Sequence, residues 1–256
     1  MAGELRAASL GSGSSGNSTV VEGADTRLLI DCGFGPRVTE RRLRALGVEP
    51  DTLDAVVVSH EHEDHLRGLV RFADRYDLPV HATHGTLRQL AAPPRRAEPF
   101  YAHHPLHLGG LTLEPFPVVH DATEPCQFVV SDGRRRLGLL TDTGTVTPHI
   151  LEMLGACDGL LLECNYDMAL LRAGPYPYWL QKRISGAWGH LANEQGAALL
   201  QAIDAARLQW VLAGHLSERN NSAEAVHDAL ASALAGYDAT VEVLGPRGEQ
   251  RWCALV

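Results

Sequence analysis

The sequence predicts an α/β protein built as a four-layer αββα sandwich, with polar residues gathered at one edge of two stacked sheets. Two observations lead to this prediction. Short apolar runs alternate with segments of helical period, and several of these runs end directly in His, Asp or Glu. With 45% hydrophobic residues among 256, the chain can bury a large core, and we expect a single domain over residues 1–256.

The strongest chemical signal is the segment SHEHEDH at residues 59–65, which follows the apolar run Ala55–Val58. That run predicts a buried strand. His60 and His62 stand two apart in extended chain, so they point the same way and can share one ion. Asp64 and His65 face elsewhere and can reach a second ion. A two-metal site is therefore favoured over a solvated histidine-rich loop, because a strand precedes the cluster and a helix-like segment follows it.

The first part of the chain predicts strands near residues 5–10, 19–22 and 27–30, a helix over 36–46, a helix through 76, and a strand at 79–82 with a helix over 83–90. The Pro-rich residues 93–105 indicate a loop. The segment GSGSSGNS at 11–18 consists of small residues whose backbone N–H groups can approach and cradle a phosphate. Ser14, Ser15 and Asn17 are its candidate substrate contacts, and a flexible turn explains the segment equally well.

The second part of the chain repeats the pattern of strands that end in ionisable residues. A strand over 111–119 ends in His120, which supplies the third histidine that the first metal needs. A hairpin of 127–131 and 136–140 leads to Asp142, and a strand at 159–162 leads to Glu163. His190 precedes a helix to residue 206, and a strand at 210–214 precedes His215. A helix over 222–234 and strands near 241–243 and 251–255 complete the second sheet.

The pattern H-x-H-x-D-H after a hydrophobic strand resembles the signature of the metallo-β-lactamase fold. The resemblance implies two divalent ions and assigns them ligands: His60, His62 and His120 for the first, Asp64, His65 and His215 for the second, with Asp142 bridging both. It also implies that Asp31 orients the histidine loop without binding metal. Mixed histidine and carboxylate ligands suit zinc, manganese or iron.

Four segments together resemble the YycJ/WalJ group of bacterial exonucleases, which are related to tRNase Z: GSGSSGNS, SHEHEDH, GHLANE at 189–194 and HLSERNN at 215–221. This resemblance implies 5′-to-3′ hydrolysis of DNA, favoured over RNA, by a metal-bridging hydroxide that Asp64 helps to orient. It implies that His190, held by Glu163, protonates the leaving group. Ser217 and Asn220 become candidate substrate contacts.

Two other functions remain open at this stage. A small-molecule hydrolase of the glyoxalase II or lactonase kind uses the same ligand set, although its leaving groups do not need the Glu163–His190 pair. A redox or sensor protein could hold iron in the same frame. The net charge of −9 does not indicate general nucleic-acid binding, but bound cations offset it locally. We also expect a homodimer, because a single acidic chain has no evident basic surface for nucleic acid and two chains together could form one.

Cysteine usage and the N-terminus bear on location. The five cysteines are scattered without a C-x-x-C pair, which is typical of a reducing compartment. Residues 1–6 lack the apolar core of a signal peptide, and no apolar run approaches the length of a membrane span. We therefore expect a cytoplasmic protein without a membrane partner.

Overall fold

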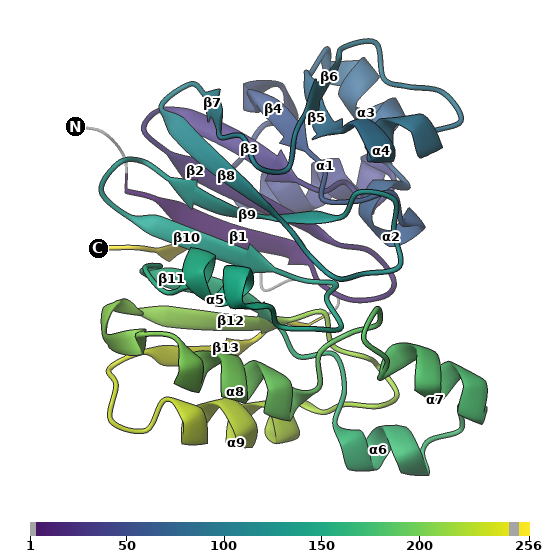
Figure 1. The fold of residues 1–256 in the computed structure, drawn as a ribbon. Coiled ribbons are helices and arrows are strands. Elements are labelled where there is room, and N and C mark those ends of the chain that lie inside the picture. Colours follow the sequence, from purple (N-terminus) through teal and green to yellow (C-terminus); the bar gives the residue numbers. More distant parts are fainter. Residues whose placement is uncertain (1–3, 246–250) are drawn as a thin grey trace.

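The computed structural model describes residues 4–245 and 251–256. Two sheets, each of seven strands among these residues, pack face to face, and helices cover both outer faces (Figure 1). This arrangement confirms the predicted αββα sandwich. It also places the carboxyl ends of the parallel strands of each sheet beside those of the other, which is where the candidate site lies.

The first sheet has the order β14-β1-β2-β3-β4-β5-β6. Its strands are β1 (Arg6–Gly11), β2 (Ser18–Gly23), β3 (Thr26–Ile30), β4 (Ala55–Val57), β5 (Val80–Thr83), β6 (Ala97–Phe100) and β14 (Cys253–Ala254). Pairing is antiparallel from β14 to β3 and parallel from β3 to β6. Its helices are α1 (Pro36–Ala45), α2 (Glu63–Leu66), α3 (Leu69–Tyr76) and α4 (His84–Gln89), with a 3-10 turn at Pro50–Thr52.

The second sheet has the order β13-β12-β11-β10-β9-β8-β7. Its strands are β7 (Leu106–Leu108), β8 (Leu111–Pro117), β9 (Cys126–Ser131), β10 (Arg136–Leu140), β11 (Gly159–Glu163), β12 (Trp210–Gly214) and β13 (Thr240–Val243). The strands from β7 to β10 form an antiparallel meander, and those from β10 to β13 are parallel. Its helices are α5 (Pro148–Leu154), α6 (Met168–Ala173), α7 (Tyr178–Ile184), α8 (Asn193–Ala202) and α9 (Ala223–Ala233), with a 3-10 turn at Ala205–Arg207.

Three apolar cores hold the layers together. Leu28 and Val57 of the first sheet meet Phe128 of the second in the central core. The outer cores join each sheet to its helices, with Phe72 of α3 in one and Leu230 of α9 in the other. Burial on both faces explains why the central strands consist of continuous apolar residues in place of an alternating pattern.

The structure corrects three predictions. Residues 97–100, expected in a loop, form β6; Pro99 is tolerated there because β6 is an edge strand with one unpaired side. The last strand, β14, joins the first sheet next to β1, and the prediction that it completes the second sheet was wrong. The helices α6 and α7 occupy a segment for which no element was predicted; both are short and have few buried residues, so they leave little apolar period in the sequence.

No helix in the described part of the chain is long and apolar enough to cross a membrane. All five cysteines are free thiols, and four of them are buried. Residues 1–3, which belong to the segment from which the absence of a signal peptide was inferred, lie outside the described residues.

We expect Phe128→Ala to lower the free energy of unfolding by about 3–5 kcal/mol, because it leaves a cavity between the two sheets. Tyr237→Ala removes an aromatic ring that is 44% exposed and should stay within about 0.5 kcal/mol of the wild type. Urea denaturation of both variants measures the difference. Equal stabilities would contradict the central packing described here.

Candidate metal centre and active site

The candidate site lies where strands of both sheets end. Asp142, Glu163 and His215 come from the carboxyl ends of the adjacent parallel strands β10, β11 and β12. His60 follows β4 of the opposite sheet by three residues. Because parallel strands present their carboxyl ends at one edge, residues more than a hundred positions apart meet there. All seven residues predicted as metal ligands are brought together at this edge.

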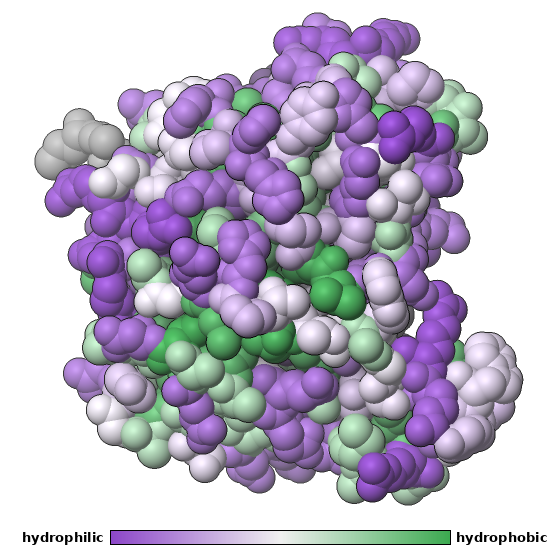
Figure 2. Space-filling view, in the orientation of Figure 1, coloured by the Kyte–Doolittle hydropathy of each residue, from purple (hydrophilic) through white to green (hydrophobic). Residues whose placement is uncertain are grey.

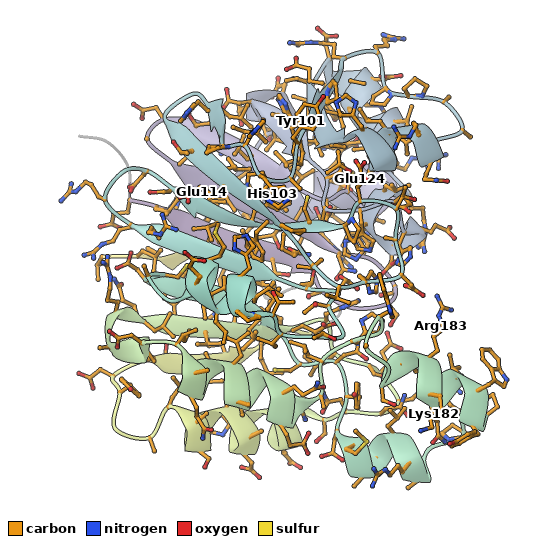
Figure 3. The ribbon with its side chains drawn as sticks, in the orientation of Figure 1. Tyr101, His103, Glu114, Glu124, Lys182 and Arg183 are labelled. Atoms are coloured by element: carbon orange, nitrogen blue, oxygen red, sulfur yellow. The ribbon has the colours of Figure 1, made fainter. Side chains whose placement is uncertain are left out.

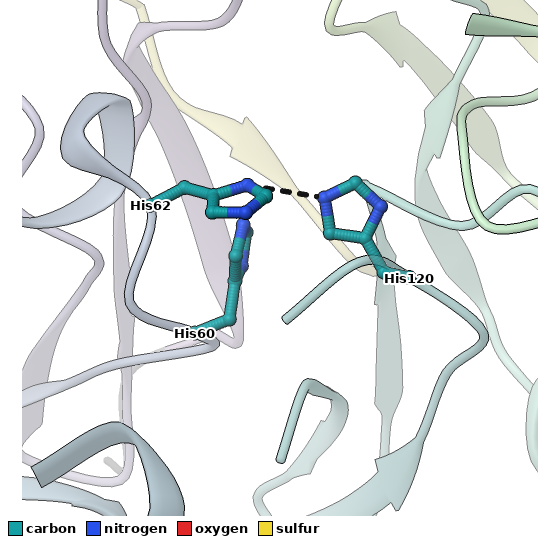
Figure 4. Close-up of side chains that lie close together, drawn as sticks. All are labelled: His60, His62 and His120. Carbon is teal, nitrogen blue, oxygen red and sulfur yellow. Dashed lines mark hydrogen bonds between the residues drawn. The ribbon is translucent and has the colours of Figure 1, made fainter. Parts of the chain in front are cut away.

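Three histidines form the first cluster. The ligand atoms of His60, His62 and His120 lie within 4.8 Å of one another. His120 Nε2 faces His62 Nδ1 at 3.2 Å (Figure 4). His60 Nδ1 contacts Ser59 Oγ at 3.0 Å, whereas its buried Nε2 has no hydrogen-bond partner within the described residues. Burial, reinforced by the neighbouring His65, holds the pKa of His60 well below its usual value, so its imidazole is neutral and able to accept a metal.

Asp64, His65 and His215 form the second cluster, again with ligand atoms within 4.8 Å. Asp64 Oδ2 lies 3.6 Å from His65 Nε2 and 3.7 Å from His215 Nε2. The same oxygen accepts a hydrogen bond from Asn17 Nδ2 at 3.0 Å, which fixes the carboxylate in place. His60 also lies close to His65, with ring centroids 4.1 Å apart, and groups with His65 and Asp142, so the two clusters adjoin each other.

Asp142 stands between the two clusters. Its Oδ2 is 3.1 Å from His65 Nε2, and its Oδ1 is 3.2 Å from His215 Nδ1 and 3.9 Å from His120 Nε2. Burial alone would raise the pKa of this carboxyl, but the charges of His215 and His65 outweigh it and hold the pKa well below its usual range. Asp142 is thus an ionised, buried carboxylate that faces both groups of histidines.

Asp31 holds the histidine loop, residues 59–65, in place through hydrogen bonds. Its carboxylate accepts hydrogen bonds from the backbone N–H of Ser59 at 2.8 Å and from Ser59 Oγ, and lies 2.7 Å from His65 Nδ1. His120 is held in the same manner, with its Nδ1 3.1 Å from the carbonyl oxygen of Gly189. Such contacts fix the tautomer and direct Nε2 of each ring into the site. The donor set and its supports fit divalent metal ions.

Backbone conformation helps to aim these side chains. Asp31, Asp142 and His215 adopt the left-handed region, with φ of 60°, 53° and 57°. Such values are uncommon for residues other than glycine and concentrate at functional sites. Gly33 serves a different need, because a Cβ there would sit 1.8 Å from the carbonyl oxygen of Asp64. The loop that carries the candidate ligands can therefore pack against the end of β3 only if residue 33 is glycine.

Glu163 and His190 form a pair at the margin of the two clusters. Glu163 is fully buried; its Oε1 lies 2.8 Å from His190 Nδ1 and 3.0 Å from His215 Nδ1. Its Oε2 accepts from the backbone N–H groups of Thr143 and Leu191. Burial would lower the pKa of His190, but the charge of Glu163 and its hydrogen bond outweigh this and raise it. The His190 side chain is 23% exposed, so it reaches the solvent side of the site.

A cavity of about 230 Å³ opens over these groups. One part of its lining consists of Ser14, His190 with Gly189, and the candidate ligands His62, Asp64, His120, Asp142 and His215. The remainder consists of Asp121 and the α7 residues Leu180, Arg183 and Ile184. Candidate metal ligands therefore line one side of the cavity, and the helix α7 lines another.

The predicted substrate contacts separate into two groups. Ser14 lines the cavity, and Ser15, next to it, is exposed. Asn17, Ser217 and Asn220 are buried: Asn17 bonds Gly13 and Asp64, and Asn220 bonds Ser217 Oγ. The structure does not bring these last three side chains to the cavity wall and places them in support of the loops around the site.

Two charged residues of the cavity, Asp121 and Arg183, were missed from the sequence. Asp121 Oδ1 lies 3.6 Å from His62 Nε2 and 3.5 Å from His120 Nε2, and Asp121 Oδ2 accepts from Arg183 Nε and Nη2 at 3.0 and 2.7 Å. The signals available were the position of Asp121 directly after His120 and the aromatic and basic run YPYWLQKR at 176–183.

Comparison with known proteins identifies the family and the fold. Residues 26–211 match the family model of the beta-lactamase superfamily domain. Exodeoxyribonuclease WalJ of Streptococcus pneumoniae is 32% identical over 91% of this chain and 90% of its own, and exodeoxyribonuclease YycJ of Bacillus anthracis is 31% identical over 84% and 83%. The metallo-β-lactamase fold protein YhfI of Bacillus subtilis has a TM-score of 0.73 at 18% identity, with 95% of this chain and 98% of that chain covered, which shows the shared fold.

Fold and site together define a metal-dependent hydrolase of the metallo-β-lactamase fold. Within that superfamily the chain belongs to the WalJ/YycJ exonuclease group. The family resemblance inferred from the sequence motifs is thereby confirmed.

Asp31→Asn should weaken binding of the second metal ion by roughly 10–100-fold, because it removes the carboxylate that orients His65. Asp25→Asn is a matched control, since Asp25 is exposed and has a similar φ of 57°. Competition of each protein against a metal chelator gives the affinities. Unchanged metal affinity in Asp31→Asn would contradict the supporting role of Asp31.

Proposed function

We propose that the protein is a metal-dependent exonuclease that hydrolyses DNA from the 5′ end. The observation that carries the proposal is the Glu163–His190 pair, in which the buried Glu163 holds His190 and His190 lines the cavity over the two clusters. The names of the relatives, both exodeoxyribonucleases, favour DNA as the polymer. The polarity comes from the family resemblance.

Seven residues would hold two divalent ions, and their mixed histidine and carboxylate donors suit zinc, manganese or iron: His60, His62 and His120; Asp64, His65 and His215; and Asp142 between the groups. When bound there, such ions would supply Lewis acidity to the phosphoryl oxygens and would lower the pKa of a water molecule. Asp64 adds a second role, because one edge of its carboxylate faces the cavity and can accept a hydrogen bond from the attacking water.

His190 acts on the departing oxygen. A nucleotide leaves as an alkoxide, which is a poor leaving group unless it is protonated as the bond to phosphorus breaks. Glu163 receives two backbone N–H bonds, so it is fixed, and its Oε1 holds His190 Nδ1. The other ring nitrogen, Nε2, is then free to carry the proton to the leaving group. A lactone or thioester hydrolase does not require this arrangement.

Nuclease activity of the metal-reconstituted protein tests the proposal directly. Duplex DNA with a 5′-phosphate is labelled at one end or the other and incubated with manganese or zinc, with Asp142→Ala as the inactive control and RNA in parallel. Stepwise release of mononucleotides from the 5′ end is expected. Hydrolysis of bis(p-nitrophenyl) phosphate without cleavage of either polymer would overturn the assignment and direct attention to thioesters and lactones.

His190→Ala should lower the rate of DNA cleavage by roughly 100- to 10,000-fold, in the range of general-acid catalysis, while two ions remain bound. The loss should be much smaller with bis(p-nitrophenyl) phosphate, because p-nitrophenolate departs without a proton. His107→Ala, on the exposed edge strand β7, is the matched control. An equal loss on both substrates, or loss of metal, would show that His190 is not a general acid.

A further inference from the structure

The helix α7 and the residues after it expose aromatic rings beside the cavity. Tyr178 is 71% exposed, Trp179 66% and Trp188 64%. Large aromatic side chains normally bury most of their surface, so three such rings within eleven residues of the chain indicate a binding surface. Figure 2 shows the lobe of α6 and α7 standing out from the body of the molecule at the lower right.

These rings do not hold the lobe together. Its own small core consists of Tyr166, Leu171 and Ala192, with Ile184 and Tyr176 partly buried against it. None of the residues of α7 is buried. The exposed rings therefore contribute little to packing, and another role must account for their presence.

Positive charge lies among the rings. Lys182 Nζ stands 5.5 Å over the ring of Tyr178. Arg183 extends from α7 towards the body of the molecule (Figure 3), where its guanidinium meets Asp121 at the cavity. In a chain of net charge −9, cations interleaved with aromatic rings mark this surface as suited to an anionic, ring-bearing ligand.

The same helix forms a wall of the cavity. Leu180 and Ile184, one turn apart, line it together with Arg183. A polymer that leaves the cavity on this side must pass over α7. An incoming phosphate can compete with Asp121 for Arg183, since the ion pair is accessible to solvent, with the Arg183 side chain 63% exposed.

We propose that Tyr178, Trp179, Lys182, Arg183 and Trp188, called here the α7 ledge, bind a single-stranded end of the nucleic-acid substrate. Bases stack on the aromatic rings while Lys182 and Arg183 contact the phosphates. This inference rests on the proposed nuclease function and adds the substrate form that the site takes. It implies that the two strands of a duplex must separate at the end before one of them enters the cavity. It also implies that binding depends little on the base sequence, because every base can stack on an aromatic ring.

Binding to two strands of equal length separates stacking from charge. The metal-loaded protein is titrated with a phosphorothioate oligothymidylate and with an abasic strand of the same backbone. Fluorescence anisotropy of a dye on each strand gives the Kd for the wild type and for every variant. In the wild type, quenching of tryptophan fluorescence also reports stacking, because two of the four tryptophans lie on the α7 ledge and Trp210 is buried. The wild type should bind the base-bearing strand more tightly.

Trp179→Ala/Trp188→Ala should raise the Kd for the base-bearing strand by about five- to a hundredfold and abolish the preference over the abasic strand. Trp179→Phe/Trp188→Phe should restore the preference, since phenylalanine also stacks. Tyr237→Ala, an exposed aromatic outside the ledge, is the control. The ratio of DNA cleavage to bis(p-nitrophenyl) phosphate hydrolysis should fall with the alanine variant.

The outcomes distinguish the two proposals. If the wild type cleaves DNA and the alanine variant keeps its preference for bases, the α7 ledge inference is overturned and the nuclease assignment stands. If the alanine variant changes only the oligomeric state, the ledge is a contact between copies of the chain. If the wild type hydrolyses the small diester but neither binds nor cleaves nucleic acid, the nuclease assignment fails, and the inference fails with it.

Discussion

The site depends on the burial of Asp142 as an ionised carboxylate between two groups of histidines. A charge removed from water is costly unless opposite charge or hydrogen bonds compensate for it. Here the compensation comes from both sheets at once, because His65 follows β4 and His215 follows β12. The stacking of the sheets and the chemistry of the site are therefore one constraint: shifting one sheet along the other would leave buried charge unpaired.

The supporting groups extend this constraint outward. Asp31 holds the histidine loop, and Glu163 contacts His190 and His215 through a single oxygen. Glu163 thereby links the candidate general acid His190 to the candidate metal ligand His215, so a shift in the position of one ring also moves the hydrogen-bond partner of the other. The helix α7 adds a separate layer, since it contacts the centre through Arg183 and Asp121 and packs on a core of its own.

The sequence was sufficient to predict the sandwich and the residues at its edge, because apolar runs that end in His or Asp are local patterns. The placement of Asp142 between the clusters could not be derived locally and came from the family resemblance. The left-handed conformations of Asp31 and His215 have no sequence signature, since neither residue is glycine. The buried positions of Asn17 and Asn220 were missed because polar loop residues suggest exposure. The α7 ledge was missed because it lacks the apolar period that marks a helix.

The most direct test of the account is the metal content of the protein after reconstitution, measured by elemental analysis for the wild type and for Asp142→Ala. Each group has three ligands, and the carboxylate of Asp142 is shared between them. We therefore expect two ions per wild-type chain and fewer than two in the variant. A wild-type chain that binds no ion and still hydrolyses phosphodiesters in the presence of a chelator would contradict the account.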